Sequence, residues 1–215
     1  DLKVYINAVP SADTFKVHSD EWISLHKETD TVLSDVLESS TSFTAIRSGP
    51  SRQQTSLFTR GTNSNHTLVT INGSPITDHS TTTGLTDIGM IDTNFAESLH
   101  LIKGPMSTIY GANAIGGVVD IKTSERVKSF ATFGLGSNNT EKLGINYIFG
   151  DLKNIKISLF SEKSGGISIY PKGDEKDGYE VSSGNIAYKK YIGNTVYDFL
   201  ILNSLTKSDL DASNA

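Results

Sequence analysis

The chain has 215 residues, a formal net charge of −5 and no cysteine. The acidic balance argues against a broad basic surface for nucleic acid, and the missing thiols exclude disulfide scaffolds and cysteine-ligated metal sites. The apolar share of 36% is low for a large buried core, and no run of about 18 apolar residues could form a membrane-spanning helix.

The first eight residues predict a short strand. Leu2, Val4 and Ile6 alternate with Lys3, Tyr5 and Asn7, which is the period of a strand. A strand at the end of a chain has unpaired edges and can add to the sheet of a partner. An ordinary first strand or a frayed end is the alternative interpretation.

Short elements and two polar loops follow. The pattern predicts strands at residues 14–17, 42–47, 66–71 and 96–102, helices starting at Ser19 and spanning 31–38, and a short helix or turn at 88–95. Asn72-Gly73 is a type I′ hairpin signal, because both residues tolerate a positive φ. The loops are residues 48–54 and 74–86, and loops carry binding residues more often than scaffold strands do.

A glycine-rich segment from residue 101 to 123 joins two predicted strands. Lys103-Gly104-Pro105 ends the first strand, and residues 107–110 are long enough for about one helical turn. Gly111 can stop that turn by taking a positive φ, and Gly116-Gly117 leads into a β-branched strand. Taken alone, this is a glycine-rich loop between strands.

The same segment resembles the plug signature of TonB-dependent outer-membrane receptors. The matching positions are Gly104, Pro105, Ser107, Tyr110, Gly111, Ala114, Gly116, Gly117, Val118, Ile121 and Thr123. Lys103 replaces the Arg of the signature, and a lysine lacks the planar fork with which an arginine grips a carboxylate. Asp120 replaces the usual Asn. A second run, within residues 60–73, is most similar to the cobalamin-receptor type.

The resemblance implies an α+β plug domain, a small mixed sheet with short helices, followed by antiparallel strands of a transmembrane β-barrel. Residues 1–8 take the place of the TonB box, residues 9–124 that of the plug and residues 125–215 that of the first barrel strands. Alternation predicts these strands at 127–136, 141–149, 155–162, 181–192 and 195–206. The period does not distinguish a barrel wall, which is apolar outside, from a soluble sandwich, which is apolar inside. Because transporter barrels need roughly 22 strands, we expect the chain to be a fragment of a larger receptor.

The resemblance also implies roles for individual residues. The TonB contact falls on Leu2, Val4, Tyr5 and Ile6. Substrate would meet the two polar loops at Arg52, Gln53, Gln54, Thr77, Asp78, His79 and Ser80. Ion pairs between plug and barrel fall on Arg60 and Lys103, and an exposed arginine at a strand end is the alternative for Arg60. The signature itself is carried by Gly104, Pro105, Tyr110, Gly111, Gly116 and Gly117.

An acidic loop supplies a candidate metal site. Asp174, Glu175 and Asp177 approximate a run with which some cobalamin receptors bind calcium, and oxygen-rich loops suit that ion. A solvated run of charges is the alternative. We expect no other cofactor to be required.

The implied function is TonB-dependent uptake of a scarce nutrient across the outer membrane of a Gram-negative bacterium, with cobalamin or another corrinoid as the first substrate. A ferric siderophore or haem is the alternative substrate, and a non-transporting surface receptor or adhesin is the alternative function. The expected partners are TonB with its inner-membrane energising complex, the small-molecule substrate and outer-membrane lipid, without nucleic acid. An enzyme is not expected, because the sequence has no P-loop, no G-x-G-x-x-G opening a helix and no H-x-x-x-H zinc spacing.

Overall fold

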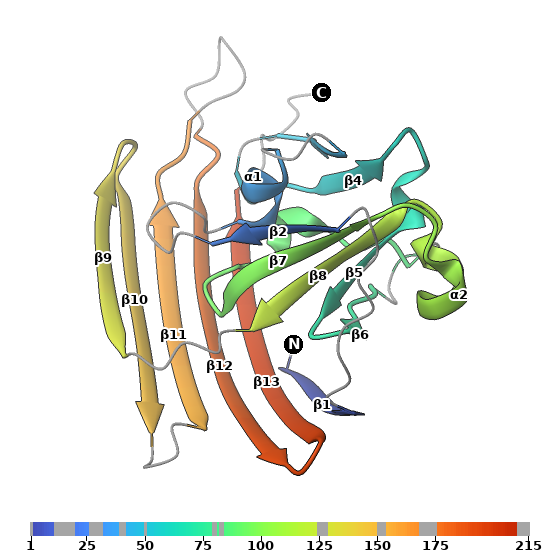
Figure 1. Cartoon of the computed structure of the whole chain (residues 1–215). Coiled ribbons are helices and arrows are strands. Elements are labelled where there is room, and N and C mark those ends of the chain that lie inside the picture. The colour runs from blue at the N-terminus through green and yellow to red at the C-terminus, as the bar shows by residue number, and fades with distance from the viewer. Residues whose placement is uncertain are drawn as a thin grey trace. The chain divides into compact units, whose positions relative to one another are not determined.

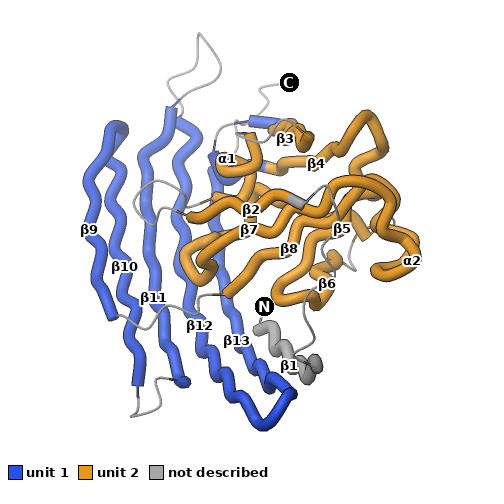
Figure 2. The backbone as a smooth tube through the Cα atoms, in the orientation of Figure 1, with its two compact units in different colours: residues 1–9, 48–53, 127–215 blue, residues 10–47, 54–126 orange. Residues whose placement is uncertain are grey.

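The computed structural model describes residues 2–10, 20–25, 32–38, 42–49, 51–78, 81, 84–123, 129–149, 154–167 and 176–209, the first of these ranges by its backbone alone. The chain divides into two compact units (Figure 2). Unit 1 comprises residues 1–9, 48–53 and 127–215, and unit 2 comprises residues 10–47 and 54–126. The loop at 48–53 therefore belongs to a different unit from the residues on either side of it.

Unit 2 is a small mixed domain of short strands and helical turns (Figure 1). Its elements are β2 (Asp20–Ser24), α1 (Leu33–Leu37), β3 (Phe43–Arg47), β4 (Thr55–Thr59), η1 (Ser64–His66), β5 (Thr67–Ile71), β6 (Ser74–Pro75), η2 (Ile88–Met90), β7 (Ala96–Lys103), α2 (Ser107–Tyr110), η3 (Ala112–Ala114) and β8 (Gly117–Thr123). Five strands form a sheet in the order β2-β7-β8-β5-β6, and β3 pairs with β4. Strands β5 and β8 run parallel, whereas the other paired strands are antiparallel. Among the described residues, no helix is long and apolar enough to cross a membrane.

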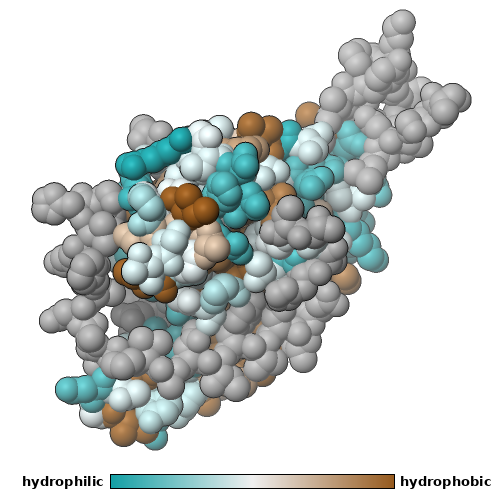
Figure 3. All heavy atoms as spheres, turned by 90° about the vertical axis from the view of Figure 1, so that its right-hand side faces the viewer, coloured by the Kyte–Doolittle hydropathy of each residue, from teal (hydrophilic) through white to brown (hydrophobic). Residues whose placement is uncertain are grey.

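The core of unit 2 lies on the central strands of this sheet. Leu99 pairs with Ile121 and Leu101 with Val119, and all four side chains are fully buried. Strands buried on both faces carry continuous rather than alternating apolar residues. This explains why β5 and most of β8 are buried at every position. Viewed from the side on which α2 lies in Figure 1, the described residues show small, separate hydrophobic patches (Figure 3).

Most of the predicted elements of unit 2 are confirmed. Strands β3, β5 and β7 and helix α1 lie within one or two residues of their predicted bounds. Asn72 and Gly73 have φ values of 49° and 83°, and Ile71 pairs with Ser74 across them, so the predicted I′ turn is confirmed. Strand β4 was not predicted, and the strand predicted at 14–17 lies outside the described residues.

The helix predicted from Ser19 is wrong. Residues Asp20–Ser24 form strand β2, which pairs antiparallel with β7. Trp22 stands opposite His100, and the two rings stack with their centroids 4.2 Å apart. Pairing with a neighbouring strand outweighs the weak helix-capping signal, because helix propensity is only a small term beside tertiary contacts.

Unit 1 is a sheet of long strands. Its elements are β1 (Leu2–Pro10), β9 (Phe130–Gly136), β10 (Thr140–Phe149), β11 (Ile155–Ser164), β12 (Tyr179–Ile192) and β13 (Thr195–Ser208), in the order β1-β13-β12-β11-β10-β9. The pairs from β9 to β13 are all antiparallel, which confirms the five predicted strands. Asn138 and Asn139 both have positive φ at the β9–β10 turn, and Gly193 does so at the β12–β13 turn.

The two faces of this sheet differ in polarity. Strand register places on one face a set of large apolar side chains that are exposed: Phe133, Leu135, Leu143, Ile145, Tyr147, Phe149, Ile155, Leu159, Ile186, Ile192, Tyr197 and Leu205. The opposite face carries polar residues that are buried: Asn146, Lys156, Ser158, Glu162, Ser164 and Asn185. This arrangement is the reverse of that in a soluble sandwich and decides the alternative that the period alone left open.

Candidate functional site

The glycine-rich segment closes on itself through backbone hydrogen bonds. The N–H of Gly104 donates to the carbonyl of Gly116 (3.2 Å), and that of Met106 donates to the carbonyl of Ala114 (2.8 Å). The N–H of Gly116 in turn donates to the carbonyl of His66 (2.8 Å). The segment is thereby fixed to the end of η1 as well as to β7 and β8.

Two of its glycines leave no room for a side chain. A Cβ on Gly116 would lie 2.6 Å from Thr62 Oγ1, and a Cβ on Gly117 would lie 2.7 Å from the carbonyl oxygen of Ile102. Close approach of backbone segments is a main use of glycine. Beneath these glycines lies a buried cluster of Leu68, Ile102, Met106, Ala114 and Val118, with Tyr110 packed against it. The segment is a structural joint between β7, η1 and β8, and its glycines serve to let the backbone segments pack closely.

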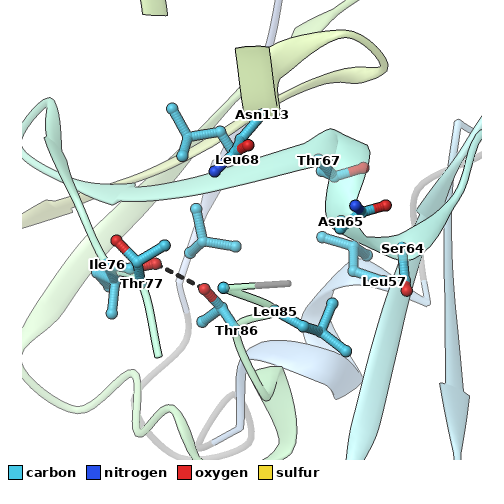
Figure 4. A pocket seen from close by; sticks show the side chains of 12 residues that line it. Leu57, Ser64, Asn65, Thr67, Leu68, Ile76, Thr77, Leu85, Thr86 and Asn113 are labelled. Atoms are coloured by element: carbon cyan, nitrogen blue, oxygen red, sulfur yellow. Dashed lines mark hydrogen bonds between the residues drawn. The ribbon is translucent and has the colours of Figure 1, made fainter. Parts of the chain in front are cut away.

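A shallow pocket, open to solvent and with room for about one water molecule, lies in unit 2 beside the second polar loop (Figure 4). Its lining residues are Leu57, Ser64, Asn65, Thr67, Leu68, Val69, Ile76, Thr77, Gly84, Leu85, Thr86 and Asn113. One hydrogen bond, from Thr86 Oγ1 to the carbonyl of Ile76 (2.6 Å), ties the two sides of the loop together. The lining is uncharged, with hydroxyl and amide groups at the rim of an aliphatic floor. Such a surface suits a neutral polar portion of a ligand.

The predicted substrate residues of this loop are only partly described. Thr77 lines the pocket, and Asp78 is half-buried close to it in sequence. His79 and Ser80 lie outside the described residues. Asp87 follows the loop and accepts hydrogen bonds from the N–H groups of Thr55 and Gly89, both at 2.9 Å. Burial raises the pKa of this carboxyl above its usual value, although both hydrogen bonds act in the opposite direction.

The first polar loop differs from what we predicted. Arg52 is almost completely buried and forms an ion pair with Glu162 of β11 (3.0 Å). Gln53 is buried and donates to the hydroxyl of Ser208 and the carbonyl of Asp209. Only Gln54 of the three predicted substrate residues is exposed. Arg52 and Gln53 therefore face protein groups of unit 1, because the loop belongs to that unit.

Arg60 and Lys103 are placed at the signature segment. Lys103 pairs with Glu21 of the neighbouring strand β2 (2.6 Å), within unit 2. Arg60 is exposed, has a positive φ of 51°, and extends its guanidinium toward Gly104. Exposure at a strand end is the alternative that we considered for Arg60, and pairing of both cations with a barrel strand stays a prediction.

The acidic loop is described only at its end. Asp174 and Glu175 lie outside the described residues, whereas Asp177 is buried. Its Oδ2 atom accepts no hydrogen bond within the described part of the chain. In the same part of the chain, no group of three or more His, Asp or Glu side chains is arranged to hold a metal ion.

A family model described as the TonB-dependent Receptor Plug Domain matches residues 24–118. The match covers most of unit 2, from the end of β2 to the start of β8, and the signature segment up to Val118. The chain belongs to the TonB-dependent receptors. Relatives in this family are outer-membrane proteins of Gram-negative bacteria.

Individual TonB-dependent receptors agree with this assignment. The chain is 32% identical over 154 residues to the vitamin B12 transporter BtuB of Vibrio vulnificus, an alignment that covers 68% of this chain and 25% of that protein. The chain thus spans about a quarter of the length of this relative.

Solved TonB-dependent receptors share the fold. The ferric yersiniabactin uptake receptor FyuA from Yersinia pestis matches with a TM-score of 0.66 at 19% identity, over 87% of this chain and 31% of that one. The copper transporter OprC matches with a TM-score of 0.67 at 16% identity, over 87% and 30%. The ferric-catecholate import receptor Fiu from E. coli K12 matches with a TM-score of 0.61 at 20% identity, over 86% and 27%.

Sequence reasoning missed the residues of this TonB-dependent receptor that hold Arg52. Glu162 accepts hydrogen bonds from Arg52 and Tyr179 and pairs with Lys142. The available signal was the alternation itself, because residues 156, 158, 160, 162 and 164 share the polar face of β11. A carboxylate in such a row calls for a cationic partner when it is buried.

Proposed function

We propose that this chain is the plug and first barrel strands of an outer-membrane receptor that takes up a corrinoid by TonB-dependent active transport. The observation that carries the proposal is the presence, in one chain, of a TonB-dependent receptor plug domain and a sheet whose exposed face is apolar.

The apolar face suits a lipid environment. Contiguous exposed apolar surface on this scale marks contact with a membrane or a partner. Aromatic residues gather on it toward the end where short connections join β10 to β11 and β12 to β13: Tyr147, Phe149, Tyr188, Tyr197 and Phe199. The rings of Tyr147 and Phe149 meet edge to face with centroids 4.5 Å apart. Outer-membrane barrels carry such an aromatic girdle at the level of the lipid headgroups.

The N-terminal strand supplies the contact with TonB. Leu2, Val4, Tyr5 and Ile6 lie on β1, and a strand recognises a partner through its backbone N–H and carbonyl groups. Substrate binding must favour the state in which this strand is accessible, since a ligand shifts an equilibrium only by its differential affinity. Energy from the inner-membrane complex then moves the plug so that the substrate passes.

A proline substitution tests the TonB contact. Val4→Pro removes one backbone donor from β1 and should abolish energy-dependent uptake while leaving substrate binding unchanged. Lys3→Ala, which keeps the donor, is the matched control. Uptake that survives Val4→Pro at the wild-type rate would refute this contact.

The substrate class rests on the relative described as a vitamin B12 transporter and on the run at 60–73. The lining of the shallow pocket beside Thr77 carries no charged residue, which favours a neutral ligand surface over an anionic chelate. An iron chelate is the second candidate, since receptors for ferric yersiniabactin and ferric catecholates share the fold.

Calcium is proposed as an aid to binding. Asp174, Glu175 and Asp177 would hold it, and the buried Asp177 Oδ2 without a hydrogen-bond donor fits a cation ligand. The ion would neutralise the carboxylates and so order the outer loop.

Calorimetry on the receptor in detergent, with cobalamin and with a ferric siderophore, tests the substrate. We expect tight cobalamin binding that calcium strengthens, and we expect Asp177→Asn to lose the calcium effect. Glu180→Gln, at an exposed acid of the same region, should keep it. Binding of the siderophore alone would overturn the corrinoid assignment and leave the transporter assignment in place.

A further inference from the structure

The loop at residues 48–53 is held by unit 1 although it connects two strands of unit 2. Strands β3 and β4 pair with each other in unit 2, from Phe43 opposite Thr59 to Arg47 opposite Thr55. Of the residues that join them, 48–53 belong to unit 1 and Gln54 belongs to unit 2. An ordinary hairpin loop stays with its own strands, so specific contacts must hold this one.

The main contact is a buried ion pair. The side chain of Arg52 is 0% exposed and that of Glu162 is 2% exposed, with Nη2 and Oε2 3.0 Å apart. The second oxygen of Glu162 accepts from the hydroxyl of Tyr179 (2.8 Å) and lies 3.1 Å from Lys142 Nζ. Removing one member of a buried pair leaves the other charge uncompensated, which makes the contact hard to break.

The backbone conformation of Arg52 also indicates that surrounding contacts hold the loop in place. Its φ is +68°, a left-handed conformation that residues other than glycine rarely adopt. Such a residue persists only when the surrounding contacts fix it. The ion pair with Glu162 is one such contact.

A second contact fixes the next residue. Nε2 of Gln53 donates to Ser208 Oγ (3.0 Å) and to the carbonyl of Asp209 (3.2 Å) at the end of β13. The aliphatic part of Gln53 packs against Gly49, where a Cβ would lie 3.0 Å from its Cγ. The loop is thus bound to both β11 and β13, and the following residue, Gln54, is exposed.

We propose that Arg52 and Gln53 are positioning residues, a latch that fixes this loop to the sheet of unit 1 and presents Gln54 as the loop's contact with the substrate. The contact of Gln54 with the substrate rests on the proposed function, whereas the latch itself rests on the observed contacts of Arg52 and Gln53. In this proposal Arg52 acts on the loop and not on the substrate directly, because its side chain is buried and its Nη2 pairs with Glu162.

The latch is tested by hydrogen exchange of residues 48–54 in the receptor in detergent, without substrate. Glu162→Gln keeps the shape of the side chain but removes its charge. We expect amide exchange in this loop to become about tenfold faster or more, since local opening is then less costly. Arg52→Lys keeps the positive charge but loses the planar guanidinium. We expect its amide exchange rate to lie between those of the wild type and Glu162→Gln.

Lys189→Gln is the matched control. It removes a cation from another ion pair of unit 1, with Asp198 at 3.9 Å, and should leave exchange at 48–54 unchanged. Wild-type exchange of the loop in Glu162→Gln would overturn the latch. Equal acceleration in Lys189→Gln would also overturn it, because the effect would then be a general loosening of the sheet.

The positioning role is tested with cobalamin as the probe. A fluorophore on Gln54→Cys labels this position, since these 215 residues have no cysteine; any cysteine in the rest of the receptor is replaced by serine first. We expect cobalamin to immobilise and protect this label, and Glu162→Gln to raise the Kd for cobalamin about tenfold while Lys189→Gln does not. An unchanged Kd in Glu162→Gln despite faster exchange would overturn the positioning role. Failure of the wild-type receptor to bind cobalamin would instead refute the proposed substrate, and the exchange result would still decide the latch.

Discussion

Units 1 and 2 place their apolar residues in opposite environments: the central strands of unit 2 are buried on both faces, whereas unit 1 exposes the apolar half of an alternating pattern. In unit 2 the paired residues Leu101 and Val119 are inside. In unit 1 the paired residues Ile145 and Leu159 are exposed, whereas Asn146 and Ser158, one residue further along, are buried. A strand pattern therefore gives the two faces of a sheet but not the solvent that each face meets. The nature of that solvent is part of the fold.

The largest expected difference between the two units is in the stability lost when a leucine is shortened, because only in unit 2 does this leave a cavity in a core. Leu101→Ala should lower the stability of the plug by about 2–5 kcal/mol, because the side chain is fully buried. Leu205→Ala, at an exposed position of unit 1, should change stability in detergent by less than about 0.5 kcal/mol. Urea unfolding of the receptor measures both, and equal losses would contradict the difference between the units.

A charge introduced on the exposed apolar face of unit 1 tests whether that face meets lipid. Leu159→Arg lies mid-strand, opposite Ile145 and Gly184, and should destabilise the receptor in lipid by about 2–4 kcal/mol. Ser161→Arg, nearer the strand end, should cost about 0–1 kcal/mol. Refolding into vesicles of defined thickness measures the cost, and a penalty independent of position would show that this face does not meet lipid.

Buried acids offer a finer contrast. Asp120 in unit 2 accepts from Thr70 Oγ1 (2.8 Å) and the N–H of Gly73 (2.9 Å) and pairs with Lys122. Asp120→Ala should cost about 1–3 kcal/mol by leaving these donors unsatisfied. Asp120→Asn, which keeps an oxygen acceptor, should cost less than half as much. Similar costs for the two variants, measured by denaturant unfolding, would show that the oxygen is not what matters.

The smallest effect is a pH dependence from Asp87. Burial raises its pKa above the value of 3.8 that holds in an unfolded chain, so the folded state binds the proton more tightly. The resulting stabilisation is complete below pH 3.8 and is lost as the pH rises through the raised pKa. Asp87→Asn should match the wild type below this window and be the more stable above it, as thermal unfolding at stepped pH would measure. The opposite order above the window would contradict the burial effect.

Local signals predicted the parts of this molecule that local chemistry determines. Asn72-Gly73 predicted its turn because few residues accept two successive positive φ values. The signature glycines predicted a tight joint, and the alternation of residues 141–206 predicted the strands of unit 1. Each of these depends on residues close together in sequence.

Long-range contacts account for what could not be predicted. The segment at Trp22 forms a strand only because β7 lies beside it. Arg52 was assigned to the substrate because it lies in a polar loop, and its partner Glu162 is 110 residues away in sequence. The alternation in β11 indicates that Glu162 needs a cationic partner, but no local signal identifies Arg52 as that partner. Gln54 is exposed, and its contact with the substrate stays a prediction.

The latch at Arg52 has a mechanical consequence. A chain drawn out from its N-terminal end would first separate β1 from β13 and then unfold β2, α1 and β3 in turn, and tension would next reach a loop that belongs to unit 1. Residues 10–47 would then be extended, about 130 Å at roughly 3.4 Å per residue, while β4 and the glycine joint beyond it bore no load. The position of one buried ion pair would thus set how much of the plug a pulling force can unravel before it meets a stop.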